Sequence, residues 1–200
     1  NNDTIVPRYK VTLAEAHIGN LEVDMKLLES YERLPQNIRQ FYLDARTFFS
    51  SSSDANFTSP EIVNAARRND LPLMSGPMLG DLNEHGVTGW LRPATTNPVG
   101  VKVTKLDGSE GKTYPIKLVK PGGRQKIVLD GLSSDTDYKY AVYEGTHLIV
   151  GGVFKTAPTP DQKGIFRLAF GSDFHKIGLH NPNLINQILK RKPLAMMLIG

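Results

Sequence analysis

The stretch LDGLSSDTDYKY, residues 129–140, decides the fold of the middle of the chain, because it joins two strand-like runs through a turn. The runs that it joins are residues 125–129 and 138–144. Tyr138 and Val142 belong to an alternating pattern along the second run. Such alternation places one face of a strand on a core and the other face in water.

Similar runs lie on both sides of this stretch, and turn signals such as Asp107-Gly108 separate them. The strand-like runs are residues 87–92, 100–105, 114–119, 125–129, 138–144 and 147–155. Short strands with regular turn signals are typical of an antiparallel β-sandwich, which we expect over residues 73–158. We expect Trp90 in its core and Arg92 on its exposed side.

Residues 1–72 show a helical pattern instead, and we find no chemistry in them. Apolar residues recur at helical spacing within residues 21–31 and 38–49, which predicts helices that each bury one face. Residues 50–53 predict a loop. An N-cap serine, a proline and an acidic residue at positions 59–61 then predict the start of a short helix.

Residues 159–200 predict a linker followed by a strand, a helix and a second strand. Residues 166–170 are strand-like, and residues 194–199 are apolar without alternation, as expected for a strand that is covered on both faces. A strand, helix and strand of this length predict a right-handed parallel unit. Because so small a unit buries too little surface to be stable alone, we expect it to begin a larger α/β domain that is incomplete here.

Gly171-Ser172-Asp173-Phe174-His175 follows the first strand of this unit. Carboxylate oxygen and imidazole nitrogen both bind divalent metals, so Asp173 and His175 are candidate metal ligands. The carboxyl ends of neighbouring parallel strands lie at one edge of a sheet. A residue directly after Gly200 would therefore lie about one strand spacing, ~5 Å, from the Asp173 loop.

The composition sets limits on the function. The chain of 200 residues has no cysteine, which excludes disulfides and thiol catalysis. Its net charge is +4, but the basic residues are scattered along the sequence, so no nucleic-acid-binding signature is present. No run approaches the ~18 apolar residues that span a bilayer. Because the sequence starts without Met, we expect a processed N-terminus and an exported protein, either periplasmic, secreted or surface-anchored.

Two resemblances sharpen these expectations. Residues 129–140 resemble the L-x-x-L-x-P-x-T-x-Y-x-Y stretch of fibronectin type III domains, with Asp135 where that family often has proline. The resemblance implies that the hydroxyl of Tyr138 closes a corner by bonding to nearby backbone. Asp173-Phe174-His175, followed by a strand that ends at Gly200, resembles the D-x-H and G-D motifs of calcineurin-like metallophosphoesterases.

The order of sandwich and strand–helix–strand unit narrows the second resemblance. Residues 73–200, including Gly76-Pro77-Met78-Leu79-Gly80, are similar to the alkaline phosphatase D family, although several of its members have a cysteine near Ser172-Asp173 and this chain has none. The resemblance implies a multidomain phosphatase: a helical N-terminal segment, a fibronectin III-like sandwich and the first βαβ unit of an αββα metallophosphoesterase domain.

The same resemblance implies an activity that these 200 residues would not possess alone. The full-length enzyme would hydrolyse phosphate mono- or diesters with two metal ions, from zinc, manganese, iron or calcium, and Asp173 and His175 would bind one of them. Its partners would be the phosphate ester substrate and the missing C-terminal part of the polypeptide. Two other interpretations remain: a non-catalytic surface or extracellular binding protein built on the sandwich, and a purely structural role for Asp173 and His175.

Overall fold

The computed structural model describes residues 7–117, 120–172 and 182–199. The chain forms two compact units: the first contains residues 1–35 and 164–200, and the second contains residues 36–163. The predicted domain limits at 72/73 and 158/159 stay predictions.

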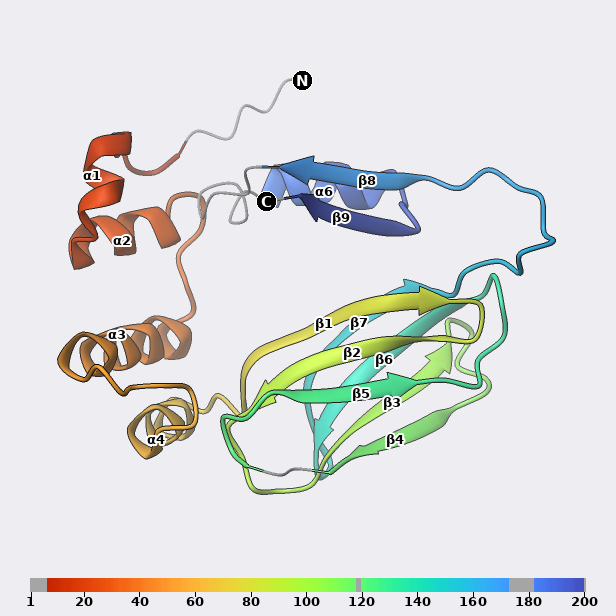
Figure 1. The fold of residues 1–200 in the computed structure, drawn as a ribbon, viewed down its shortest axis with the longest axis horizontal. Coiled ribbons are helices and arrows are strands. Elements are labelled where there is room, and N and C mark those ends of the chain that lie inside the picture. The colour runs from red at the N-terminus through yellow and green to blue at the C-terminus, as the bar shows by residue number, and fades with distance from the viewer. Residues whose placement is uncertain (1–6, 118–119, 173–181, 200) are drawn as a thin grey trace. The chain divides into compact units, whose positions relative to one another are not determined.

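The larger part of the second unit is a sandwich of two antiparallel sheets (Figure 1). One sheet has the order β1-β2-β5 and consists of β1 (Leu73–Asn83), β2 (Gly86–Pro93) and β5 (Gln125–Leu129). The other has the order β4-β3-β6-β7 and consists of β3 (Val99–Lys105), β4 (Lys112–Ile116), β6 (Asp137–Glu144) and β7 (His147–Lys155). The chain is therefore mostly β-sandwich with a few helices, as the alternating runs predict.

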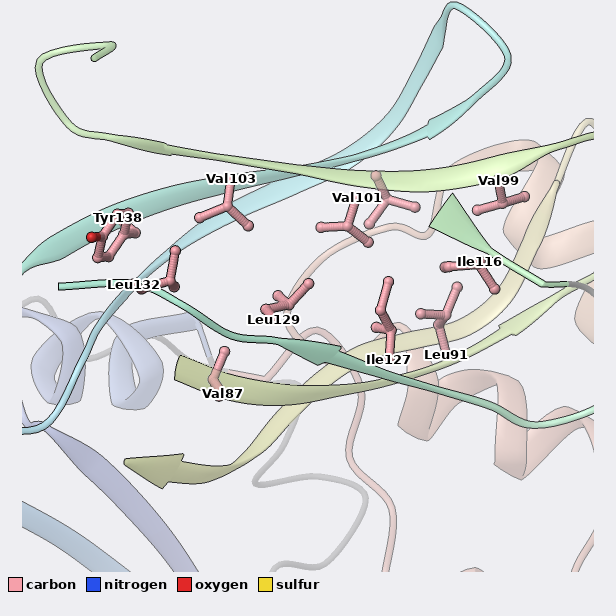
Figure 2. Close-up of a cluster of buried hydrophobic side chains, with 11 residues drawn as sticks. Val87, Leu91, Val99, Val101, Val103, Ile116, Ile127, Leu129, Leu132 and Tyr138 are labelled. Atoms are coloured by element: carbon pink, nitrogen blue, oxygen red, sulfur yellow. The ribbon is translucent and has the colours of Figure 1, made fainter. Parts of the chain in front are cut away.

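Side chains from both sheets meet in one core, and Figure 2 shows them pointing toward one another. The core residues are Val87, Leu91, Val99, Val101, Val103, Ile116, Ile127, Leu129, Leu132, Tyr138 and Val142. Along β3, the valines at 99, 101 and 103 are buried, whereas Gly100 and Lys102 between them are not, as expected for a strand with one face on the core. Burial of these aliphatic side chains is the main stabilising term of this unit.

The expectation for Trp90 is wrong. Val87, Gly89 and Leu91 are buried on one face of β2, and Leu91 is fully buried, whereas Trp90 lies on the opposite face and is half-buried. Because successive side chains of a strand point to opposite faces, the core can accept Leu91 or Trp90 but not both. Arg92 shares the outer face with Trp90 and is half-buried against it.

Strand β1 was not among the predicted runs. It pairs with β2 at the edge of its sheet, and its register shifts between Leu73 and Ser75, between Ser75 and Met78, and between Gly80 and Asn83. These irregularities interrupt the alternation that identifies a strand in sequence. A proline, Pro77, also argues against a central strand, and an edge strand is where proline is tolerated.

The helices of the second unit are α3 (Gln36–Ser51) and α4 (Pro60–Arg68). The predicted start of α4 is confirmed, with Ser59 as the N-cap residue and Pro60 at the first turn. The prediction of a loop from residue 50 is wrong by two residues, since α3 continues through Ser51. The hydroxyls of Ser50 and Ser51 donate to helix carbonyls three residues earlier, which satisfies groups at the helix end.

The first unit contains α1 (Leu13–Ile18), α2 (Leu21–Leu28), β8 (Leu168–Ser172), α6 (Pro182–Lys190) and β9 (Ala195–Ile199). A capping box between Thr12 and Glu15 starts α1, and Gly19, with a φ of 73°, ends it. Strands β8 and β9 pair in parallel with α6 between them in sequence. The predicted strand–helix–strand order with parallel strands is confirmed.

Candidate metal site at the ends of strands β8 and β9

The register of β8 and β9 sets the carboxyl ends of the two strands side by side. Ser172, the last residue of β8, lies opposite Ile199, the last residue of β9. Neighbouring strands are about 4.8 Å apart, so the chain leaves both strands at adjacent points. Asp173 follows Ser172 directly, and Gly200 follows Ile199 directly.

The candidate ligands Asp173 and His175 themselves lie outside the described residues. Within residues 7–117, 120–172 and 182–199, no group of three or more His, Asp or Glu side chains could hold a metal ion. The donor chemistry of the pair does suit the implied metals, since carboxylate and imidazole bind zinc, manganese and iron. The described histidines outside this loop, His17, His85 and His147, are all exposed.

Both strands of the pair expose apolar side chains. Phe170 of β8 is 75% exposed and Leu198 of β9 is 59% exposed. The expectation that the second strand is covered on both faces is therefore wrong for the described residues. A two-stranded sheet with a single helix has too few neighbouring elements to cover two faces, and none of the described residues of α6 is buried.

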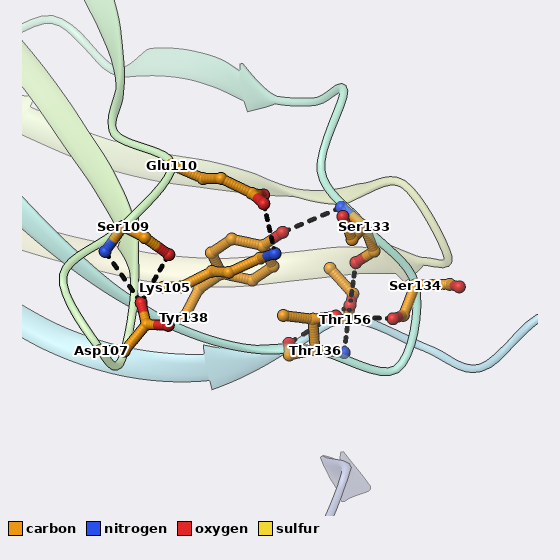
Figure 3. Close-up of polar contacts among 9 residues, drawn as sticks. All are labelled: Lys105, Asp107, Ser109, Glu110, Ser133, Ser134, Thr136, Tyr138 and Thr156. Atoms are coloured by element: carbon orange, nitrogen blue, oxygen red, sulfur yellow. Dashed lines mark hydrogen bonds and ion pairs between the residues drawn. The ribbon is translucent and has the colours of Figure 1, made fainter.

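The exit from the sandwich toward β8 is fixed by a hydrogen-bonded corner, drawn in Figure 3. The hydroxyl of Tyr138 accepts a hydrogen bond of 2.9 Å from the Ser133 backbone N–H, which confirms the corner that the fibronectin resemblance implies. Thr156 is fully buried beside it. Its hydroxyl donates to the Ser133 carbonyl over 2.7 Å and accepts from the Thr136 N–H over 3.0 Å.

The sequence did not identify Thr156 as a structural residue. Its only signal was the Phe154-Lys155-Thr156-Ala157-Pro158 stretch at the end of the sandwich. Beyond it, Lys155 forms an ion pair of 2.6 Å with Asp135, and this bond and one from Gln162 hold the pKa of Asp135 below its usual value. The corner thus ties the end of β7 and the following linker to the β5–β6 connection.

Comparisons with known proteins give no family. No protein-family model and no curated protein matches the chain. Among solved structures, one of PhoD is similar, at 25% identity over 47% of this chain and 21% of that chain, with a TM-score of 0.39. The chain therefore spans about a fifth of the length of that protein.

Two further solved structures match a similar share of the chain. The fn3 domain of human collagen alpha-1(XX) is 20% identical over 46% of this chain and 90% of that chain, with a TM-score of 0.34. The long sensor domain of the anti-sigma factor RsgI4 from Pseudobacteroides cellulosolvens is 11% identical over 44% and 91%, with a TM-score of 0.35. Scores at this level do not assign the chain to a family.

Proposed function

We propose that this chain is the N-terminal portion of a metal-dependent phosphoesterase of the alkaline phosphatase D type. The observation that supports the proposal most is the parallel register that sets Ser172 opposite Ile199. Because Asp173 follows Ser172 and Gly200 follows Ile199 in the sequence, this register supports a shared metal site built from the segments that follow the two strands. The sandwich upstream and the motif order in the sequence support the same assignment.

The roles of the chain's own residues follow from their chemistry. When two metal ions are bound, they supply an activated water and neutralise charge on the phosphoryl oxygens. The carboxylate of Asp173 and one imidazole nitrogen of His175 would bind metal, and the other nitrogen would need a hydrogen-bond partner that fixes the ring. Further ligands must come from other segments, because two side chains do not complete a two-metal site.

The test uses the full-length natural protein, purified with its metals. We expect Asp173→Asn and His175→Gln each to reduce the bound metal and to lower phosphatase activity by roughly 1,000-fold, since metal stabilisation is worth several kcal/mol. Metal is measured by mass spectrometry and activity with p-nitrophenyl phosphate. Asp161→Asn and His147→Gln change the same residue types at exposed positions and serve as controls. Unchanged metal content in the first two variants would contradict the proposal.

A second candidate is a non-catalytic binding protein built on the sandwich. It is favoured by one observation: residues 36–163 form a compact unit with a core of their own. In that case the wild-type full-length protein would carry no stoichiometric metal and hydrolyse no phosphate ester, so the same measurements separate the two candidates. No described helix is long and apolar enough to cross a membrane, and export stays a prediction.

A further inference from the structure

The outer face of the β1-β2-β5 sheet carries a pair of arginines. Leu91 of β2 lies opposite Gln125, the first residue of β5, and both are buried. Arg92 follows Leu91 on β2 and is half-buried, and Arg124 directly precedes β5 and is exposed, so the two arginines lie at neighbouring positions at this end of the strand pair. Trp90 and Lys126 form the neighbouring row on the same face. The row order follows from the alternation of a strand and the antiparallel register.

Arg92 is held in place by contacts that leave much of its hydrogen-bonding capacity unused. Its guanidinium carbon lies 4.3 Å from the centre of the Phe57 ring and 5.7 Å from that of Trp90. Its Nη1 donates to the Gly122 carbonyl over 2.8 Å. A guanidinium has five N–H donors in a fixed fork, and neither Arg92 nor Arg124 forms an ion pair with any described residue.

Positive charge is therefore concentrated at these two arginines, and no acid of the described residues pairs with either of them. Like charges at neighbouring positions repel each other. Burial, and after it the charge of Arg124, lowers the pKa of Arg92. The ion pair that this face does have, between Lys126 and Asp81 at 3.7 Å, belongs to the neighbouring row and is exposed. An anionic ligand would relieve the repulsion between the two arginines.

We propose that Arg92 and Arg124 form a binding site for an oxyanion, the phosphate group of an ester or free phosphate. Paired guanidiniums match the oxygens of a phosphate through parallel N–H bonds, and such charge-assisted bonds are about twice as strong as neutral ones. The aromatic rings of Phe57 and Trp90 fix the fork of Arg92 before the ligand arrives, which reduces the ordering cost of binding. Neither Asp173 nor His175 is part of this proposed site.

Ligand binding can be followed by the fluorescence of Trp90, because it is the single tryptophan of the chain. We expect its fluorescence to change saturably when the 200-residue chain is titrated with phenyl phosphate in the presence of EDTA, which keeps the candidate metal site empty. Inorganic phosphate, titrated separately, distinguishes a free anion from an ester as the ligand. Sodium chloride at equal ionic strength controls for general screening of charge.

The variant Arg124→Gln should weaken this binding by at least about tenfold, since a charge-assisted bond is worth about 1.5–3 kcal/mol. Lys139→Gln removes the same charge from an exposed site on β6, in the other sheet, and should titrate like the wild type. Thermal unfolding of both variants checks that the fold is intact. The proposal is overturned if neither phosphate nor phenyl phosphate gives saturation, if sodium chloride gives the same change, or if the two variants bind equally.

Discussion

The hydroxyl of Tyr138 performs a structural task that its buried ring makes possible. The side chain is 1% exposed, and its ring stacks on Phe154 with 5.7 Å between ring centres. From that position the hydroxyl reaches the Ser133 N–H, which has no other described partner. The Tyr138 hydroxyl therefore helps to fix the connection between β5 and β6.

Tyr138→Phe should lower the free energy of unfolding by about 1–2 kcal/mol, because the Ser133 N–H then loses its hydrogen bond while the ring still fills the core. Urea denaturation measures the change. Tyr143→Phe is a matched control, since Tyr143 is partly exposed and its hydroxyl has no described hydrogen bond. Equal effects of the two substitutions would show that the corner bond contributes nothing.

Thr156→Val should cost more, about 2–3 kcal/mol, because it leaves both the Ser133 carbonyl and the Thr136 N–H without their bonds. Valine has a similar shape, so the loss reports the hydroxyl and not a cavity. Thr113→Val on the exposed side of β4 makes the same replacement away from the corner and should be nearly neutral. A stability of Thr156→Val at the wild-type level would refute this assignment.

Gly122 is needed where the sandwich meets the loop between α3 and α4. Its φ is +75°, and a Cβ there would lie 2.0 Å from the Phe57 carbonyl oxygen. Gly122→Ala should therefore cost at least about 3 kcal/mol, of which about 1–2 is the left-handed backbone and the rest the clash. Gly145→Ala, with a φ of +57° and open space around it, should show the backbone cost alone in the same unfolding measurement.

At the scale of elements, the contribution of β2 to stability depends on which of its faces is buried. Leu91→Ala should lower stability by about 3 kcal/mol, because it removes a fully buried side chain from between the sheets. Val128→Ala, at a position on β5 that is 54% exposed, should change stability by less than about 0.5 kcal/mol. If Leu91→Ala proved as mild as Val128→Ala, the assignment of Leu91 to the core would be wrong.

The β8–β9 pair is the element that depends most on what surrounds it. Its strands are apolar, as buried parallel strands usually are, yet their described side chains are largely exposed. Its register nevertheless follows the expected parallel arrangement. The order and parallel direction of the two strands could thus be predicted from the sequence, whereas the covering of their faces could not.

For the whole molecule, the 200 residues alone should hydrolyse no phosphate ester above the buffer rate, with or without added zinc, manganese, iron or calcium. The physical reason is that Asp173 and His175 supply too few ligands for a two-metal site. A phosphatase assay on the pure 200-residue chain measures this. Metal-dependent turnover that Asp173→Asn abolishes would contradict the requirement for further ligands.

Much of the sandwich could be predicted, because alternation in strands such as β3 and β6 reflects one buried and one exposed face. The edge strand β1 could not, since its bulges break the alternation. Trp90 was assigned to the wrong face, because the strand-like run alone does not show which of two adjacent apolar residues, Trp90 or Leu91, is buried. The arginine pair could not be predicted either, because Arg92 and Arg124 are far apart in sequence and only the pairing of β2 with β5 brings them together.

The sequence by itself determined the strands other than β1 and the order of the parallel unit, because short-range periodicity and turn chemistry encode them. The resemblance of residues 129–140 to fibronectin type III domains indicated the tyrosine corner. Only the tertiary structure decided which face of β2 is buried, that Thr156 completes the corner, and that Ser172 lies opposite Ile199. These features depend on register between segments distant in sequence. Register is set by the packing of whole sheets, which no local pattern contains.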